Sequence, residues 1–445
     1  MDSKQSLLFQ WVAKLVNIKT NELAACLLSF VFLFTLMAAY FILKPIRDAR
    51  VSDWTNAELS IVWTATFLLS IVAVSLYSFA VSRVNFRVLV PALYSVFACI
   101  FLSFYFVTHN DLQVPLIAKA FNVWMGVFAL FHISVFWSFM SDLFNPEQAT
   151  RLFAFIATGS SLGAITGPSI TVIFAEQLGL GNLLLVASVL LLIPVPIIIY
   201  LENQKRRSIL DKEHHLELSE LDMIGGSMLS GFKALLHNRY LVSIAAFILL
   251  YTSVSSFVYF EIKNLLVVYD EIERAKIWAR IDLGVNILSV LTGWFATSRI
   301  VGRFGLGISL ALMPILMVFG LLTLSIFPLV SVAVALQMMR RAGNYAITRP
   351  GREMLYTQVS REDRFKAKPV IDIVVYRAGD MTTGWLFTGL TQGLNLGLSS
   401  MAAIGALIAT FWATIAYRLG NGFDKQHTES RSSSIIQKVD EVDNL

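Results

Sequence analysis

Residues 340–356 read RRAGNYAITRPGREMLY and residues 366–380 read KAKPVIDIVVYRAGD, two segments that carry many charges among residues apolar enough to lie in a bilayer. A charged side chain at membrane depth costs roughly 2.5–3.5 kcal/mol on insertion scales, so such residues usually face a protein interior or a water-filled path. The pattern therefore predicts a membrane-embedded region with an internal polar site.

The composition of the whole chain agrees with a membrane protein. Of its 445 residues 56% are hydrophobic and 15% are charged, and the mean hydropathy is +0.68. Runs such as 23–43 and 183–201 approach or exceed the roughly 20 residues that a spanning helix needs. They are apolar on every face, whereas the strands of membrane β-barrels alternate polar and apolar residues. We therefore expect an all-α membrane protein.

Windows of roughly 20 residues predict twelve transmembrane helices. The predicted spans are residues 23–43, 59–81, 88–108, 115–141, 152–175, 182–201, 240–262, 276–298, 306–326, 328–348, 367–392 and 397–419. The expected organisation is an N-terminal six-helix bundle at 1–201 with an interfacial helix at 5–19, a cytoplasmic linker at 202–238, a C-terminal six-helix bundle at 239–420 and a disordered cytoplasmic tail at 421–445.

Lysine and arginine positions predict the orientation. Most basic residues lie in the N-terminal segment, in alternate links, in the central linker and in the tail, so both termini are expected in the cytoplasm. This distribution also explains the net charge of +5 without nucleic-acid binding. The exceptions, which lie on the predicted outer side, are Lys44, Arg47, Arg50, Lys263, Arg274 and Lys276. The chain has no leader rich in Arg and Ser, so we expect a bacterial cytoplasmic membrane.

Two short patterns recur at nearly the same offset. YFILK at 40–44 returns as YFEIK at 259–263, and AVSR at 80–83 returns as ATSR at 296–299, offsets of 219 and 216 residues. Matches at corresponding places of two six-span halves indicate a duplicated bundle. Parallel repeats of six helices, with a binding site between the halves, are typical of major facilitator transporters.

The sequence has no enzyme motif, because it lacks a phosphate-binding glycine loop with Lys-Ser/Thr and a nucleophile elbow. Neither its two cysteines nor its six histidines show metal-ligand spacing, and we expect no cofactor. The intramembrane charges have two interpretations. They could form internal salt bridges or interface anchors, or arginine and lysine could bind an anion while a buried acid carries a proton.

Three patches resemble the ATP/ADP translocases of plastids and intracellular bacteria. REMLY at 352–356 followed by KAKPVIDIVVYRAG at 366–379 is similar to that family's KEMAY and KGKAAIDVVxxRxGK, FWSFMSD at 136–142 is similar to its WGFANE, and ILKPIRD at 42–48 is similar to its ILRDTKD. The resemblance implies a twelve-helix, facilitator-like exchanger of nucleotides. It places Asp142 where the family has a functional glutamate, and Lys44 or Arg47 near a residue implicated in substrate contact.

The chain departs from the family at one charge, because Asp380 stands where the family has a lysine. We therefore expect a divergent, short member that carries a nucleotide or another anionic phosphorylated metabolite. The candidates for substrate binding are Lys44, Arg47, Asp142, Lys263, Arg352 and Arg377, and those for coupling or gating are Asp48, Asp282, Glu353, Asp372 and Asp380.

Two alternatives remain at this stage. A proton-coupled carrier of another small metabolite or a drug could use Asp282, Asp372 or Asp380. A membrane scaffold without transport activity would pair off its charges in a closed interior. In the leading hypothesis, a monomer in the lipid bilayer moves a small anionic substrate by alternating access.

Overall fold

The computed structural model describes residues 22–81, 83–84, 86–109, 115–210, 228–295, 297–360, 367–368 and 370–443, which form helices joined by short turns. No β-strand occurs within these ranges. The predicted all-α class is therefore confirmed. The interfacial helix expected at 5–19 lies outside the described residues.

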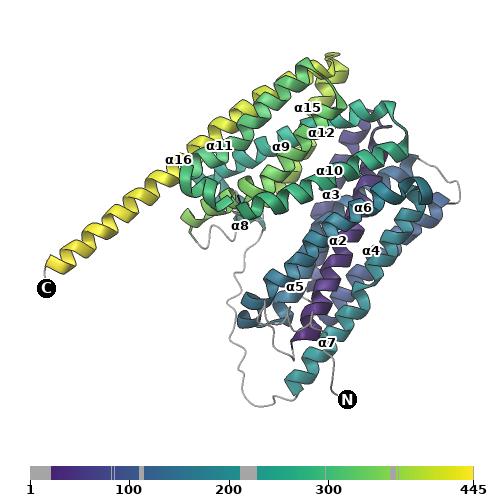
Figure 1. Cartoon of the computed structure of the whole chain (residues 1–445), viewed down its shortest axis with the longest axis horizontal. Helices are drawn as coiled ribbons and strands as arrows, with labels where there is room; N and C mark the ends of the chain where they lie inside the picture. Colours follow the sequence, from purple (N-terminus) through teal and green to yellow (C-terminus); the bar gives the residue numbers. More distant parts are fainter. Residues whose placement is uncertain are drawn as a thin grey trace. The chain divides into compact units, whose positions relative to one another are not determined.

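Each of the twelve predicted spans overlaps one or more helices in its described residues (Figure 1). The N-terminal helices are α2 (Leu23–Val51), α3 (Asn56–Val81), α4 (Phe86–His109), α5 (Pro115–Leu143), α6 (Pro146–Leu192) and α7 (Pro194–Leu210). The later ones are α8 (Met228–His237), α9 (Arg239–Leu265), α10 (Glu271–Phe295), α11 (Thr297–Ile326), α12 (Val330–Gly343), α13 (Arg349–Leu355), α15 (Tyr376–Thr388) and α16 (Leu398–Asp443). Short 3-10 turns are η1 (Leu266–Val268) and η3 (Tyr356–Gln358), and π-helical segments are η2 (Asn344–Thr348), η4 (Val370–Val375) and η5 (Gly389–Gly393).

Two predicted links turn out to be sharp bends at glycine. Gly179 has φ 75° and ψ 160° inside α6, and it separates the leg that holds span 152–175 from the leg that continues into α7. Gly305 has φ 75° and ψ 171° inside α11. Positive φ is accessible to glycine at no steric cost, so the helix can kink at these two positions without a separate loop. Among the described residues, eight helices or merged helices are long and apolar enough to cross a membrane, and one of them contains both legs around Gly179.

The last helix is longer than the sequence led us to expect. α16 continues through Asp443, whereas a disordered tail was expected from residue 421. One contact explains part of this difference. Asp424 accepts hydrogen bonds from the backbone N–H groups of Leu306 and Gly307, at 3.0 Å each, and so holds the extension against the start of the long leg of α11. These amides are free to bond because they follow the bend at Gly305.

The chain forms two compact units. Unit 1 contains residues 1–53, 64–219 and 269–286, and unit 2 contains residues 54–63, 220–268 and 287–445. Helices α3 and α10 therefore each contribute one segment to unit 1 and one to unit 2.

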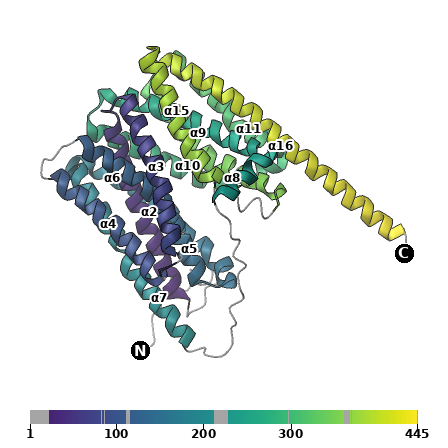
Figure 2. The same ribbon diagram turned by 180° about the vertical axis from the view of Figure 1, so that it is seen from behind.

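The centre of unit 1 is the contact between α2 and α6, which lie side by side (Figures 1 and 2). Gly159, Gly163 and Gly167 repeat every four residues on one face of α6. A Cβ at these positions would press on backbone atoms of α2, such as the carbonyl oxygens of Phe34 and Ala38. Small residues at this spacing allow close backbone approach, which is a main source of helix association in membranes.

Aromatic side chains fill the space between α2, α4 and α5. Phe32 of α2 meets Tyr94 of α4 and Phe136 of α5 edge to face, with ring centroids 5.2 and 4.8 Å apart. His132 of α5 stacks on Tyr40 at 4.4 Å, and its Nδ1 lies within hydrogen-bond distance of backbone carbonyls one turn earlier. This histidine is a packed core residue of unit 1.

In unit 2, α9 packs against α15, α16 and α12. Phe257 of α9 meets Phe387 of α15 with ring centroids 5.3 Å apart, and its ring also lies against Gly405 of α16. On the same helix, Tyr251 and Phe247 both contact the ring of Trp412 of α16. α9 is thus the central helix of this unit, as α2 is of the other.

Candidate functional site

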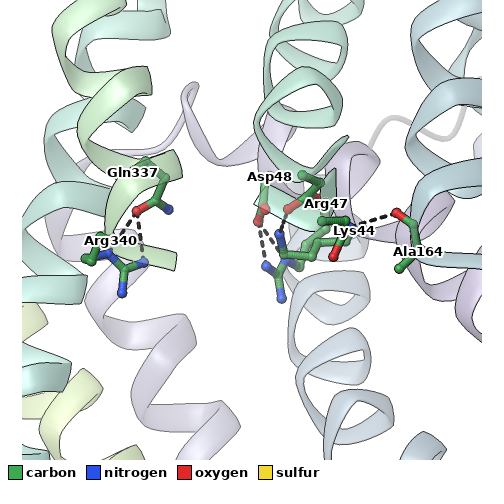
Figure 3. Close-up of polar contacts among 8 residues, drawn as sticks. Lys44, Arg47, Asp48, Ala164, Gln337 and Arg340 are labelled. Atoms are coloured by element: carbon green, nitrogen blue, oxygen red, sulfur yellow. Dashed lines mark hydrogen bonds and ion pairs between the residues drawn. The ribbon is translucent and has the colours of Figure 1, made fainter. Parts of the chain in front are cut away.

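An ion pair joins α2 to the first part of α10 inside unit 1. Lys44 Nζ lies 2.5 Å from Asp282 Oδ1, with 13% of the lysine side chain and none of the aspartate exposed. One turn after Asp282, Asn286 donates a hydrogen bond of 2.7 Å to the backbone carbonyl of Ala164 in α6 (Figure 3). Asp282 and Asn286, on one face of α10, therefore link this helix to two other helices of the unit.

The other basic residues that end α2 are paired as well. Arg47 lies 2.7 Å from Asp48, its buried neighbour in sequence (Figure 3). Arg50 lies 2.9 Å from Glu271 of α10.

The start of α10 carries the matching basic residues. Arg274 contacts Asp53, and Lys276 contacts Glu176 of α6, both at 2.5 Å. Five of the six outer-side exceptions to the charge rule, Lys44, Arg47, Arg50, Arg274 and Lys276, thus have acidic partners within unit 1.

Asp142 lies apart from this group. It ends α5, is half-exposed and pairs with Lys205 of α7 at 2.7 Å. Glu22, which precedes α2, binds Arg151 shortly after Asp142 in the chain. Lys44 follows Glu22 by about 20 residues of nearly continuous helix, which corresponds to about 30 Å along the axis. The structure therefore does not bring Asp142 and Lys44 into one site.

The conspicuous sequence at 340–380 forms a charged network where α13 ends and η4 begins. Arg352 lies 3.3 Å from Glu353 and 3.4 Å from Asp372, and Lys368 lies 2.5 Å from Glu353. Burial raises the pKa of Glu353, but the hydrogen bond and charge of Lys368, with a contribution from Arg352, outweigh it, so the pKa lies below its ordinary value. Three of the predicted site residues, Arg352, Glu353 and Asp372, thus belong to one ion-pair network that links α13 to η4.

The remaining candidates lie along α9 and α15. Asp380 accepts a hydrogen bond from Ser256 of α9 at 3.1 Å, and Arg377 approaches it at 4.0 Å. Lys263 is buried near the end of α9 and donates to Asn56 Oδ1 at 3.1 Å. The acid at position 380 therefore faces a neighbouring helix of unit 2.

Arg340 is a site residue that the candidate set missed. It ends α12 with 5% of its surface exposed, and its Nε and Nη2 donate to Gln337 Oε1 at 3.1 and 2.8 Å (Figure 3). Its Nη1 donates to the Tyr251 hydroxyl at 3.3 Å, and the ring of Tyr376 lies 6.3 Å from that of Tyr251. Within the described part of the chain, no carboxylate forms an ion pair with Arg340. A buried guanidinium held by neutral groups retains its attraction for an anion.

Glu261 of α9 is the second residue that was missed. Its exposure is 0%, and neither carboxyl oxygen has a hydrogen-bond partner in the described ranges. The sequence feature that could have identified Glu261 is an acidic residue inside the predicted span 240–262. No group of three or more His, Cys, Asp and Glu residues that could hold a metal ion occurs among the residues that the structure describes.

The sequence profile of the Major Facilitator Superfamily matches residues 18–350, about three quarters of the chain. The chain belongs to the Major Facilitator Superfamily. It is thus a multi-pass membrane protein with the superfamily's transporter fold, as the internal repeat predicted. No relative was found among the curated proteins.

Solved structures of major facilitator transporters share this fold. The nucleoside transporter NupG matches with a TM-score of 0.61 and 11% identity over 90% of this chain and 99% of that chain. A bacterial homologue of the human lysosomal transporter Spinster, in an inward-facing and unoccupied conformation, matches with a TM-score of 0.56 and 14% identity over 92% and 98%. At these identities the likeness concerns the fold alone.

Proposed function

We propose that this major facilitator protein imports or exchanges a small anionic solute by alternating access, with a nucleotide or another phosphorylated metabolite as the favoured class. The observation that carries the proposal is Arg340, whose buried guanidinium is held by Gln337 and Tyr251 without an acidic partner in the described residues. Desolvating a cation without a counter-charge is costly. Binding an anionic substrate would supply the missing charge.

The geometry of Arg340 suits an oxyanion. A guanidinium has five N–H donors, and the contacts to Gln337 and Tyr251 use three of them. One donor then remains on each terminal nitrogen. Two parallel N–H groups of arginine are the usual means of binding two oxygens of a phosphate or carboxylate. Tyr376 adds an aromatic face close to Tyr251.

Two of the predicted substrate-binding residues, Lys44 and Arg352, fit gating better than substrate contact. Lys44 is engaged by Asp282, and Arg352 by Glu353 and Asp372. A cation already neutralised by a carboxylate is a weaker anion site, but an ion pair that breaks and re-forms can stabilise one state of a two-state carrier. We therefore assign the Lys44–Asp282 pair and the Arg352 network to conformational control. Extensive ion pairing is also expected of a membrane scaffold without transport activity. The neutral surroundings of the buried Arg340 guanidinium favour transport instead.

Two further features support the substrate class and its setting. The resemblance of residues 352–379 to ATP/ADP translocases and the fold shared with the nucleoside transporter NupG are both compatible with a nucleotide-like solute. The distribution of lysine and arginine supports both termini in the cytoplasm. We further propose a monomer in a bacterial cytoplasmic membrane.

Ligand-dependent thermal stabilisation tests the proposal, because a ligand that binds the native state raises its apparent stability. The purified protein in detergent is screened against nucleotides, nucleosides and sugar phosphates. We expect a shift with at least one phosphorylated compound, its loss in Arg340→Gln and its retention in Arg341→Gln, which removes the same charge from the next position. Stabilisation only by uncharged nucleosides, or an equal shift in Arg340→Gln, would contradict the proposal.

A further inference from the structure

A buried acid in α9 lies outside every role assigned so far. Glu261 is fully buried, and both of its carboxyl oxygens lack a hydrogen-bond partner among the described residues. An ionised carboxylate in such surroundings costs many kcal/mol, so the group takes up a proton instead. A neutral carboxyl costs only the burial of a polar group.

The surroundings of Glu261 follow from the helices packed on α9. Glu261 lies one turn after Phe257 on α9. The ring of Phe257 packs against Gly405 of α16 and against Phe387 of α15, and the side chain of Leu321 of α11 also lies against Gly405. Residues one turn apart share a face of a helix. Neither the segment 398–416 of α16 nor the segment 306–326 of α11 contains an acidic or basic residue.

Three other charged groups on α9, α15 and α3 bind partners other than Glu261. Asp380 of α15 is bound to Ser256, more than one turn before Glu261 on α9. Lys263, two residues on and therefore on a different face, binds Asn56 and Asn264. On α3, Glu58 is half-buried and accepts from the backbone N–H and the hydroxyl of Thr55. None of these groups forms an ion pair with Glu261 in the part of the chain that is described.

We propose that Glu261 carries a proton in this conformation and releases it to water when the helices around α9 separate, so that transport is coupled to proton movement. On release the O–H bond of the carboxyl breaks, the electron pair stays on the carboxylate and the proton passes to water. On closure a proton returns before the group is buried again. The proton occupancy stands on the burial of Glu261, whereas the coupling rests on the transport function proposed above.

Infrared spectroscopy tests the occupancy without reference to transport. The carbonyl stretch of a protonated carboxyl is separate from the stretches of a carboxylate, so the full-length protein in lipid nanodiscs is compared with Glu261→Gln at neutral pH. We expect the difference spectrum to contain one protonated-carboxyl band that belongs to Glu261. Glu58→Gln, which removes a half-buried acid of the same unit that is hydrogen-bonded to Thr55, should leave this band unchanged. A difference spectrum with only carboxylate bands would overturn the proposal.

Proteoliposome uptake tests the coupling. An inward proton gradient should stimulate uptake of the transported solute several-fold in the wild-type protein, and Glu261→Gln should retain exchange of solute for solute while losing the response to the gradient. A wild-type protein that shows the infrared band but ignores the gradient would reject the coupling and leave the transport function standing. A wild-type protein that moves no solute would reject the transport function, and with it the coupling, while the band would still report the proton.

Discussion

Removing one partner of the ion pair between Lys44 and Asp282 is expected to be among the most destabilising single substitutions in unit 1. The two charges lie 2.5 Å apart, with the aspartate fully buried and the lysine 13% exposed. At an effective dielectric constant of 20 their attraction is about 7 kcal/mol, most of which offsets desolvation. Removing one partner of a buried pair typically costs about 3–5 kcal/mol, because the other charge is left uncompensated. We therefore expect Lys44→Met and Asp282→Asn each to destabilise the protein by about this amount.

A double-mutant cycle separates the pair from its surroundings. If the cost of each single substitution comes from the stranded partner, Lys44→Met/Asp282→Asn will be no less stable than either single variant. The coupling free energy is then about 3–5 kcal/mol, as large as the cost of one substitution. Equilibrium unfolding in mixed micelles with increasing sodium dodecyl sulfate gives the three differences. Additive single effects, with no coupling, would refute a direct buried interaction between these residues.

Two other expectations concern packing and pH. Gly163→Ala places a methyl group against the carbonyl oxygen of Phe34, so it should lower the free energy of unfolding by about 1–3 kcal/mol. The control Gly181→Ala has open space around it and should be neutral or stabilising by up to about 1 kcal/mol. Equal effects of the two substitutions in a thermal unfolding assay would argue against the close contact of α2 and α6. The folded-state pKa of Glu353 is lowered by its basic neighbours despite burial, so its contribution is present above the ordinary pKa of 4.5 and is lost as the pH falls through the folded pKa. Lys368→Met should therefore flatten the stability profile below about pH 4.5, and an unchanged profile would show that the pair contributes nothing.

The sequence predicted the fold well because membrane helices are specified locally. A spanning helix requires about 20 apolar residues, and each of the predicted spans from 23–43 to 397–419 overlaps helix in its described residues. What could not be predicted was the backbone at the bends. Gly179 and Gly305 look like any other glycine in the sequence, and their positive φ is visible only in the structure.

The candidate site was predicted less completely, since pairing depends on contacts between distant helices. The sequence indicated that Lys44 and Asp282 were buried charges, but not that they neutralise each other across 238 residues. The resemblance to ATP/ADP translocases grouped Asp142 with these two residues. In the structure Asp142 ends α5 and pairs with Lys205, far from Lys44. Conversely, Arg340 was read as one charge among many, and only its neutral partners Gln337 and Tyr251 distinguish it.

The π-helical segments show the same limit. η2, η4 and η5 all fall in the stretch from 344 to 393, which also contains the ion-pair network around Arg352. π-segments inside helices are often found at functional sites. Hydrophobic periodicity alone does not distinguish them from ordinary helix, because their extra residue per turn changes only a few positions.

Solute counterflow tests the central claim most directly. Proteoliposomes loaded with an unlabelled phosphorylated solute, chosen from the thermal-shift screen, are diluted into the labelled compound, and accumulation is followed for the wild-type protein, Arg340→Gln and Arg341→Gln. If Arg340 is the anion-binding cation of this transporter, accumulation occurs in the wild type and in Arg341→Gln and falls at least tenfold in Arg340→Gln, which corresponds to about 1.4 kcal/mol or more. Counterflow of equal size in Arg340→Gln, or counterflow of uncharged solutes alone, would contradict the account.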